Sequence, residues 1–89
     1  MYRIELTTKA QRDLDKISGG DLERVVAAIR VLRDTPRPQG AKKLKGPIFR
    51  VRTGDWRVIY AVFDKDRLVV IGKIARRSER TYDDVDGLF

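Results

Sequence analysis

The pattern of apolar and polar residues divides the chain into stretches suited to strands and stretches suited to helices. Residues 2–6 alternate between apolar and charged side chains, which predicts a short strand with one buried face. Residues 49–53 and 56–63 flank a Gly-Asp pair and also have strand character. The run from 67 to 75 is apolar on both faces, as is typical of a strand inside a sheet. We therefore expect this last run to lie in the sheet interior.

Two amphipathic helices are predicted between the first strand and the later ones. Thr7 and Thr8 offer N-caps to a helix that runs to about Ile17, where Ser18-Gly19-Gly20 is expected to stop it. Asp21 is expected to cap the second helix. The apolar residues fall on one face of each helix: Ala10, Leu14 and Ile17 in the first, and Leu22, Val25, Val26, Ile29 and Leu32 in the second. Two such helices joined by a glycine turn form a helical hairpin.

The Gly54-Asp55 pair predicts a β-hairpin turn between the flanking strands. A two-residue loop would place Arg52 opposite Arg57, and a loop two residues longer would place Arg57 opposite Arg50. Arg50 and Arg52 share one face because side chains alternate along a strand, so neither register separates the arginines. Like charges placed opposite each other destabilise a sheet by a few tenths to about 1 kcal/mol. A bound anion would explain the arrangement, since guanidinium groups suit phosphate. The alternative is a basic sheet face that is simply solvated.

The order of these elements predicts one α+β domain over residues 1–89. It consists of an N-terminal strand, a helical hairpin and a three-stranded antiparallel meander, all strands forming one sheet. The helices are expected to cover the apolar face of the β-hairpin, with Trp56 and Tyr60 in the core, and to leave the arginine face open. Residues 83–89 carry three acids and no base, and we expect this acidic tail to fold over the cations and shield them.

Composition and charge narrow the chemistry. Lys and Arg number 20 against 13 Asp and Glu, and the resulting net charge of +7 favours an anionic partner, with nucleic acid as the first candidate. There is no cysteine and no histidine, so disulfides are excluded and the commonest general base and metal ligand are missing. We expect no metal and no cofactor. The chain also lacks a signal-peptide pattern and a membrane-length apolar run, which predicts a cytoplasmic protein without a membrane partner.

A set of short motifs, spread over essentially the whole chain, resembles the RelE/ParE superfamily of type II toxins. They are Pro36-Arg37-Pro38, Lys43-Leu44-Lys45-Gly46, Phe49-Arg50-Val51-Arg52, Gly54-Asp55-Trp56-Arg57-Val58-Ile59-Tyr60, and Ile74-Ala75-Arg76-Arg77 with Tyr82. The resemblance implies a microbial-ribonuclease-like sheet and a RelB-like antitoxin, acidic or amphipathic, that neutralises the toxin. In the RelE branch it implies a ribosome-dependent, metal-independent mRNA endonuclease in which the 2′-hydroxyl of the RNA attacks. In the ParE branch it implies inhibition of DNA gyrase.

The resemblance also implies which residues form the site. Residues matching the catalytic set of RelE-like toxins are Arg50, Arg52, Arg57, Arg77 and Tyr82, with Arg76 the next choice after Arg77. Contacts with RNA and the ribosome are expected from Arg37, Lys42, Lys43, Lys45, Arg76 and Arg80, where residues 41–47 form a basic loop. These residues bind phosphate whatever the base sequence.

The chain departs from the RelE pattern at Arg50 and Arg52, where RelE-like toxins carry lysines. An arginine stabilises negative charge but effectively never gives up its proton, so both residues are poor general bases. Tyr82 is then the titratable candidate for the proton acceptor. The alternative for Tyr82 is a tail aromatic that packs on the sheet edge.

Three functions follow from these observations. A toxin that cleaves mRNA on the ribosome is favoured by the complete basic set and Tyr82. A ParE-type gyrase inhibitor is favoured by the two arginine substitutions, and a non-catalytic nucleic-acid-binding relic is allowed by the basic composition alone. The expected partners are the ribosome with mRNA and the antitoxin, and the toxin alone is not expected to bind DNA specifically.

Overall fold

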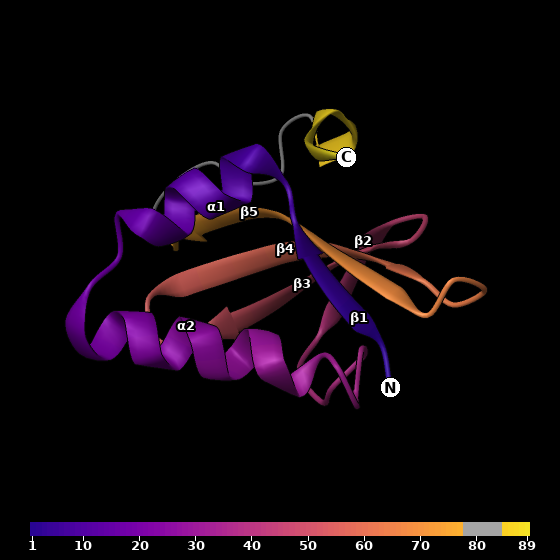
Figure 1. The fold of residues 1–89 in the computed structure, drawn as a ribbon, viewed down its shortest axis with the longest axis horizontal. Coiled ribbons are helices and arrows are strands. Elements are labelled where there is room, and N and C mark those ends of the chain that lie inside the picture. The colour runs from indigo at the N-terminus through magenta and orange to yellow at the C-terminus, as the bar shows by residue number, and fades with distance from the viewer. Residues whose placement is uncertain (78–84) are drawn as a thin grey trace.

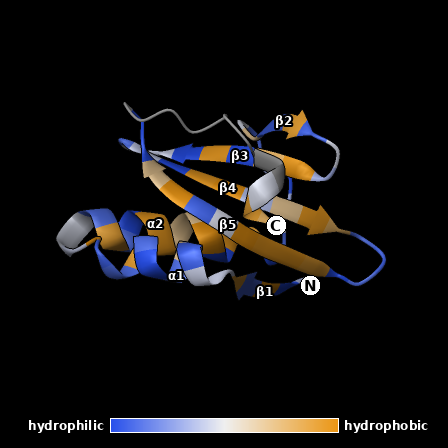
Figure 2. Cartoon of the chain, turned by 90° about the horizontal axis from the view of Figure 1, so that it is seen from above, coloured by the Kyte–Doolittle hydropathy of each residue, from blue (hydrophilic) through white to orange (hydrophobic). Residues whose placement is uncertain are grey.

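The computed structural model describes residues 1–77 and 85–89, with only the backbone of residues 85 and 86. Two helices lie on one side of a twisted sheet, as Figures 1 and 2 show from two directions. In chain order the elements are β1 (Arg3–Leu6), α1 (Thr8–Asp15), α2 (Gly19–Val31), β2 (Lys42–Lys45), β3 (Ile48–Thr53), β4 (Trp56–Phe63), β5 (Leu68–Arg76) and the 3₁₀ turn η1 (Val85–Leu88). The predicted α+β class is confirmed.

The sheet has the strand order β1-β5-β4-β3-β2. β1 pairs in parallel with β5, and every other neighbouring pair is antiparallel. The predicted interior position of the apolar run is confirmed, since β5 lies between β1 and β4. The predicted hairpin register is confirmed as well: Thr53 pairs with Trp56 and Arg52 with Arg57, around a turn in which Gly54 has a φ of 58°. A positive φ of this kind favours glycine.

The basic segment before the hairpin forms a strand, where a loop was expected. β2 pairs with β3 at the edge of the sheet, with an irregularity between Lys43 and Lys45. Its lysines are exposed, and Leu44 packs against a cluster of Ile48, Ile59 and Ala61. An exposed strand edge rich in lysine resists pairing with other chains, so a run of lysines is compatible with an edge strand. The sheet therefore has one strand more than the sequence predicted.

The boundaries of the helical hairpin also differ from expectation. Thr7 caps α1 as predicted, its Oγ1 accepting a hydrogen bond of 3.1 Å from the Ala10 N–H. α2 begins at Gly19, with Ser18 as its N-cap residue, so Asp21 lies in the first turn and is not the cap. A carboxylate there still interacts favourably with the positive end of the helix dipole. Gly19 has a φ of 62°, which lets the chain reverse directly into the helix.

Apolar side chains pack on both faces of the sheet. The main core lies between sheet and helices and includes Val25, Val58, Tyr60 and Ile71, with Trp56 packed against it, as predicted for both aromatics. On the opposite face the small Ile48, Ile59 and Ala61 cluster is covered by Leu88. Figure 2 shows the apolar residues running along the central strands. Within the described part of the chain, no helix is long and apolar enough to cross a membrane.

Gly72 lies directly under the C-terminal residue. A Cβ built at this position would fall 2.6 Å from the Phe89 ring and 3.1 Å from the Cβ of Leu88. Any larger residue would therefore displace the C-terminal segment from the sheet. The face opposite the helices thus has an apolar half, covered in part by Leu88 and Phe89, and a basic half.

Candidate nucleic-acid interface

Three arginines gather on the basic half of the face opposite the helices, and we call Arg50, Arg52 and Arg57 the arginine face. Arg52 is paired directly with Arg57 across the hairpin, and Arg50 is paired with Ile59 on β4 and with Lys42 on β2. Arg50 is only 8% exposed, whereas Arg52 is exposed and Arg57 is half-buried. The predicted like-charged arrangement is confirmed, and the sheet itself does nothing to separate these charges.

The arginine face is short of acceptors. Among the described residues, no carboxylate forms an ion pair with Arg50 or Arg52. The Nε of Arg50 is buried and has no hydrogen-bond partner in that part of the chain. A buried donor without a partner costs about 1–3 kcal/mol, and more when the group is charged. The arrangement is therefore costly for stability unless an acceptor is supplied.

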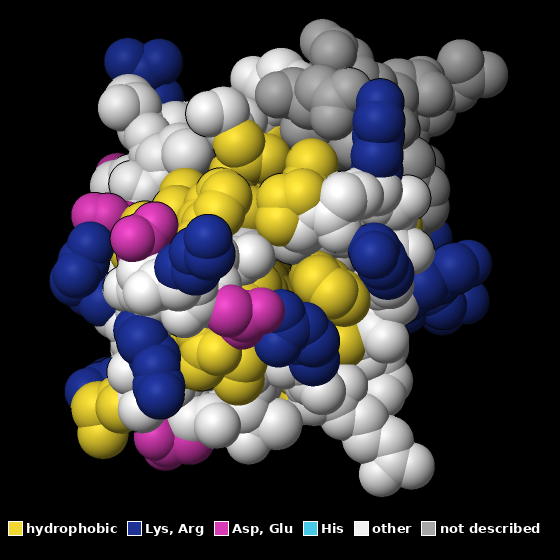
Figure 3. All heavy atoms as spheres, turned by 90° about the vertical axis from the view of Figure 1, so that its right-hand side faces the viewer, with side chains coloured by type: hydrophobic (Ala, Val, Ile, Leu, Met, Phe, Trp, Pro, Cys, Tyr) yellow, Lys and Arg dark blue, Asp and Glu magenta, His cyan; other side chains and the backbone are white. Residues whose placement is uncertain are grey.

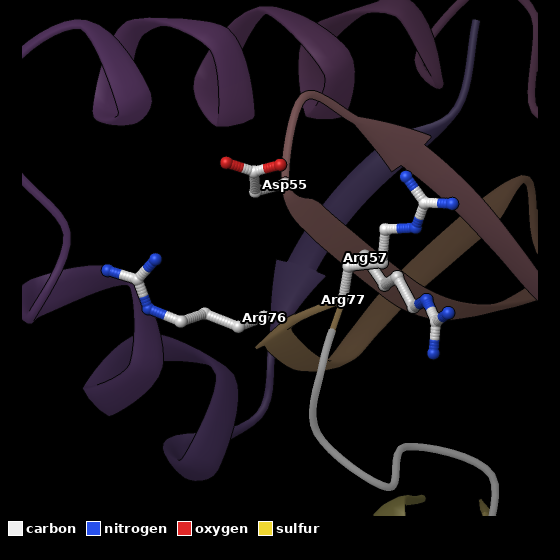
Figure 4. A pocket seen from close by; sticks show the side chains of 4 residues that line it. All are labelled: Asp55, Arg57, Arg76 and Arg77. Carbon is white, nitrogen blue, oxygen red and sulfur yellow. The ribbon is translucent and has the colours of Figure 1, made fainter.

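The end of β5 brings two more arginines to this region. The Arg77 N–H donates a hydrogen bond of 2.7 Å to the Asp55 carbonyl, which ties the end of β5 to the hairpin turn. A cavity of about 450 Å³ lies here, lined by Asp55, Arg57, Arg76 and Arg77. Figure 4 shows the Arg57 and Arg77 side chains extending to the same side, and Arg76 extending to the opposite side. Of the two adjacent arginines, Arg77 is the one that lies beside Arg57.

Arg76 has a different neighbour. Its guanidinium lies over the Trp56 ring, 4.7 Å from the ring centroid, on the side of the sheet that carries the helices. Arg76 is the last residue of β5 and Arg77 lies in the turn that follows, and their side chains extend to opposite sides (Figure 4). The Nε1 of Trp56 is buried and has no hydrogen-bond partner in the described part of the chain.

The sheet register brings one further cation to the arginine face, and sequence reasoning missed it. Lys73 is paired with Ile59, the same residue that Arg50 pairs with from the other side. The β4–β5 ladder is irregular between Ile59 and Tyr60, because Gly72 is an extra residue in β5. A bulge of this kind places two consecutive side chains on one face. The only sequence signal was a glycine inside an apolar strand.

Arg37 lies at the other end of the hairpin. One of its terminal nitrogens lies 2.6 Å from an Asp64 oxygen, and the Tyr2 hydroxyl donates a 2.6 Å hydrogen bond to the other oxygen. The guanidinium also lies 5.4 Å from the Phe49 ring centroid. Hydrogen bonds from Arg37 and Tyr2 hold the pKa of Asp64 below its ordinary value, and the bond to Asp64 raises the pKa of Tyr2. The structure therefore does not bring Arg37 together with the arginine face.

The remaining predicted residues have mixed positions. Lys42, Lys43 and Lys45 are exposed on β2, the strand that borders the arginine-bearing β3. Arg80, Tyr82, Asp83 and Asp84 lie outside the described residues, and so does the side chain of Asp86. Tyr60 is not a substitute for Tyr82, because burial raises its pKa to about 12 and its hydroxyl donates to the Pro36 carbonyl at 2.8 Å. Residues 1–77 and 87–89 hold no group of three or more acidic side chains placed to bind a metal ion.

The family of the chain follows from a family model. The model of the ParE toxin of the type II toxin-antitoxin system parDE matches residues 4–81, which is most of the chain. Together with the basic hairpin and the helix-covered sheet, this match shows that the chain belongs to the RelE/ParE superfamily of type II toxins.

Individual relatives carry the RelE name. The putative toxin RelE1 of Methanocaldococcus jannaschii is 33% identical over 81 residues, which cover 85% of this chain and 90% of the relative. The RelE–RelB complex of Pyrococcus horikoshii contains a chain that is 28% identical, with a TM-score of 0.79 over 89% of this chain and 98% of that one. The RelBE2 toxin-antitoxin complex of Mycobacterium tuberculosis gives 31% identity and a TM-score of 0.74 over 85% and 98%. The chain is thus a RelE-like toxin by sequence and fold.

Proposed function

We propose that this protein is a ribosome-dependent mRNA endonuclease that inhibits translation. The observation that carries the proposal is the arginine face, where two arginines lack any carboxylate partner in the described residues and a third faces one of them. Clustered guanidiniums without carboxylates are suited to phosphate, which offers planar pairs of oxygens to their donors.

The proposed reaction is attack of an RNA 2′-hydroxyl on the adjacent phosphorus. A bond forms between the 2′-oxygen and phosphorus as the 2′-hydroxyl loses its proton, and the bond to the 5′-oxygen breaks. The leaving oxygen takes up a proton from water, and the products are a 2′,3′-cyclic phosphate and a 5′-hydroxyl. The phosphorane between them carries more negative charge than the starting diester. Arg52 and Arg57 stabilise that charge from the hairpin, and Arg77 is close enough to Arg57 to act on the same phosphate. Removing one such donor typically costs 10²- to 10³-fold in rate.

The reaction also needs a proton acceptor for the 2′-hydroxyl. Arginine effectively cannot serve, so Arg50 and Arg52 act as charge stabilisers and not as bases. Tyr82 is the first candidate for the base, and the ribosome is proposed to position the mRNA. Lys73 is the second candidate, because a lysine can give up its proton and this one shares the face of Arg50 by register.

The proposed partner is a RelB-like antitoxin. Relatives of this chain form complexes with RelB in Pyrococcus horikoshii and with the antitoxin of the RelBE2 pair in Mycobacterium tuberculosis. An acidic or amphipathic segment that folds on contact would supply carboxylates to Arg50 and Arg52. The proposed site of action is the cytoplasm, where the ribosomes are.

Controlled induction of the toxin without its antitoxin tests the proposal. We expect protein synthesis to stop within minutes and the mRNA to show new ends inside codons, whereas an Arg57→Ala variant produced at the same level leaves the mRNA intact. Ongoing protein synthesis with uncut mRNA contradicts the proposal.

Inhibition of DNA gyrase is a second candidate, and two observations favour it. The matching family model is that of the ParE toxin, and residues 50 and 52 are arginines where RelE-like toxins carry lysines. The same induction distinguishes the two functions, because a gyrase inhibitor triggers DNA-damage signalling while translation continues. A chain that produces neither effect is a non-catalytic relic.

A further inference from the structure

A second basic cavity lies between α1 and the end of β5, on the side of the sheet that carries the helices. Its volume is about 390 Å³, and it is lined by Lys9, Asp13, Lys16, Trp56, Lys73, Ile74 and Arg76. Four of these residues are cations and one is an acid. The seven residues come from three separate parts of the chain, residues 9–16, Trp56 and residues 73–76, so no local sequence pattern identifies the cavity.

The one acid in the cavity is used for structure. One oxygen of Asp13 accepts a 3.0 Å hydrogen bond from the Ile74 N–H, and its other oxygen is 3.2 Å from the Lys9 ammonium. β4 pairs with β5 as far as Arg76, but β1 pairs with it only as far as Ile71, so Asp13 joins α1 to the edge of β5 that β1 leaves unpaired. In the described part of the chain, no carboxylate pairs with Lys16, Lys73 or Arg76. The cavity therefore keeps an excess of positive charge.

Arg76 connects this cavity to the arginine face. It lines both the second cavity and the one formed with Arg57 and Arg77. Stacking on Trp56 at 4.7 Å holds its guanidinium in place, so a ligand has less side-chain entropy to overcome. The two cation-lined cavities thus share Arg76, which lies at the end of the sheet.

We propose that this cavity binds the phosphodiester backbone of an RNA strand that continues from the arginine face around the end of the sheet. The inference rests on the proposed function for the identity of the strand. An extended polyanion is the ligand whose successive charges can occupy two cation-lined cavities that share a residue, and such contacts are blind to base sequence. Lys9 and Lys16 contribute binding and not chemistry, so their loss raises KM and leaves kcat unchanged.

The test compares two double variants with equal change in charge. Lys9→Gln/Lys16→Gln removes two cations from the cavity, and both lysines are exposed. Arg12→Gln/Lys65→Gln is the control, since both residues are exposed and neither lines the cavity. The probe is a short 2′-O-methyl oligoribonucleotide, which cannot be cleaved because its nucleophile is blocked. Trp56 is the only tryptophan, so its fluorescence reports binding at the cavity.

We expect the cavity variant to bind the oligonucleotide about tenfold more weakly at physiological salt. The slope of log K against log salt should become shallower by about 1.4, because each phosphate of a single strand that the protein no longer neutralises changes the slope by about 0.7. The control variant should stay within twofold of the wild type, and thermal unfolding should show that both variants are folded.

Equal losses of affinity in the two double variants would overturn the proposal, since they would show attraction by the overall positive charge and no specific binding at the cavity. Unchanged affinity in the cavity variant would overturn it too. Weaker antitoxin binding with unchanged oligonucleotide binding would assign the cavity to an acidic protein segment instead. The nuclease proposal is tested by a different readout. If it fails, the mRNA stays intact after induction, whereas binding of an oligonucleotide that cannot be cleaved is not affected.

Discussion

The two ends of the β3–β4 hairpin treat their arginines in opposite ways. At the end near Asp64, Arg37 pairs with a carboxylate that also accepts from Tyr2, and the group ties together the N-terminus, the segment after α2 and the β4–β5 turn. At the other end, Arg50 and Arg52 have no carboxylate partner among the described residues and Arg52 faces Arg57. The first arrangement supports the fold. The second opposes it, which is why we propose that a ligand binds there.

We call the hairpin end where Arg37 pairs with Asp64 the paired end, and the surface around it also carries charges of both signs. Figure 3, which views the side of the molecule with the β4–β5 turn, shows Lys and Arg side chains interspersed with Asp and Glu. Opposite charges mixed in this way make a solvated surface with little attraction for a polyanion. Variants at the two ends of the hairpin test whether the arginine face differs from this surface.

The largest expected effect is on cleavage. Arg52→Ala should lower the rate of ribosome-dependent mRNA cleavage about 10²- to 10³-fold, because it removes one donor aimed at the phosphorane. Arg30→Ala is the matched control, since Arg30 is an exposed arginine on α2 and lines neither cavity. Single-turnover cleavage of mRNA bound to ribosomes measures both. Equal rates for the two variants would show that the arginine face has no special role in cleavage.

The next effect concerns the proton acceptor. Tyr82→Phe should lower the cleavage rate about 100-fold and flatten the rise of rate with pH, as loss of a general base does. The pH–rate profile provides the check. If Tyr82→Phe cleaves like the wild type while Lys73→Arg is slow, the role of the base belongs to Lys73 and not to Tyr82.

A smaller effect is expected at the paired end. Tyr60→Phe removes the hydrogen bond from the buried Tyr60 hydroxyl to the Pro36 carbonyl, and should cost about 1 kcal/mol of unfolding free energy. Cleavage should not change, because Tyr60 faces the helix-side core. Denaturant unfolding measures the stability. A loss of activity without a loss of stability would be the contrary result.

Arg52→Ala should have the opposite effect on stability. It removes a like-charged pair across the hairpin, so the free energy of unfolding should rise by a few tenths to about 1 kcal/mol. The gain should shrink at high salt, where exposed charges are screened. If the variant is instead less stable than the wild type, Arg52 contributes to the fold and the proposed contrast fails at this residue.

The smallest effect is a dependence of stability on pH at the paired end. Because Asp64 has a pKa below its ordinary value of 3.8, its contribution to stability is present above that pH and is lost as the pH falls through the lowered pKa. Asp64→Asn should therefore melt at a lower temperature than the wild type near neutral pH, with a difference that narrows in acid. A difference that is constant down to about pH 2 would contradict the stabilising role of the carboxylate.

Much of the fold could be predicted because local rules determine it. Gly54-Asp55 admits a two-residue turn, and that turn sets the register that brings Arg52 opposite Arg57. The apolar residues 68–71 predicted an interior strand because only burial on both faces suits them. Where the sequence misled, a tertiary contact decided the outcome. β2 exists because Leu44 finds a buried cluster, and no local pattern reveals that.

The site was predictable only in part, for the same reason. The arginine face follows from alternation along one hairpin, whereas the position of Arg77 beside Arg57 is seen only in the structure, directly after β5. The pairing of Arg37 with Asp64 joins residues far apart in the chain, so it could not be read locally. Lys73 reaches the arginine face through the bulge at Gly72, and the second cavity needs α1 to meet the free end of β5. No short sequence pattern predicts either the position of Lys73 or the contact between α1 and β5.

The most direct measurement is the chemistry of the new RNA ends. mRNA on ribosomes is incubated with the purified wild-type toxin, with Arg52→Ala and with Arg30→Ala, and the ends are analysed. We expect cuts inside the codon that leave a 2′,3′-cyclic phosphate and a 5′-hydroxyl, nearly abolished by Arg52→Ala and unaffected by Arg30→Ala. Uncut mRNA with the wild-type protein, or equal cleavage by the two variants, would contradict the claim that the arginine face is the catalytic site.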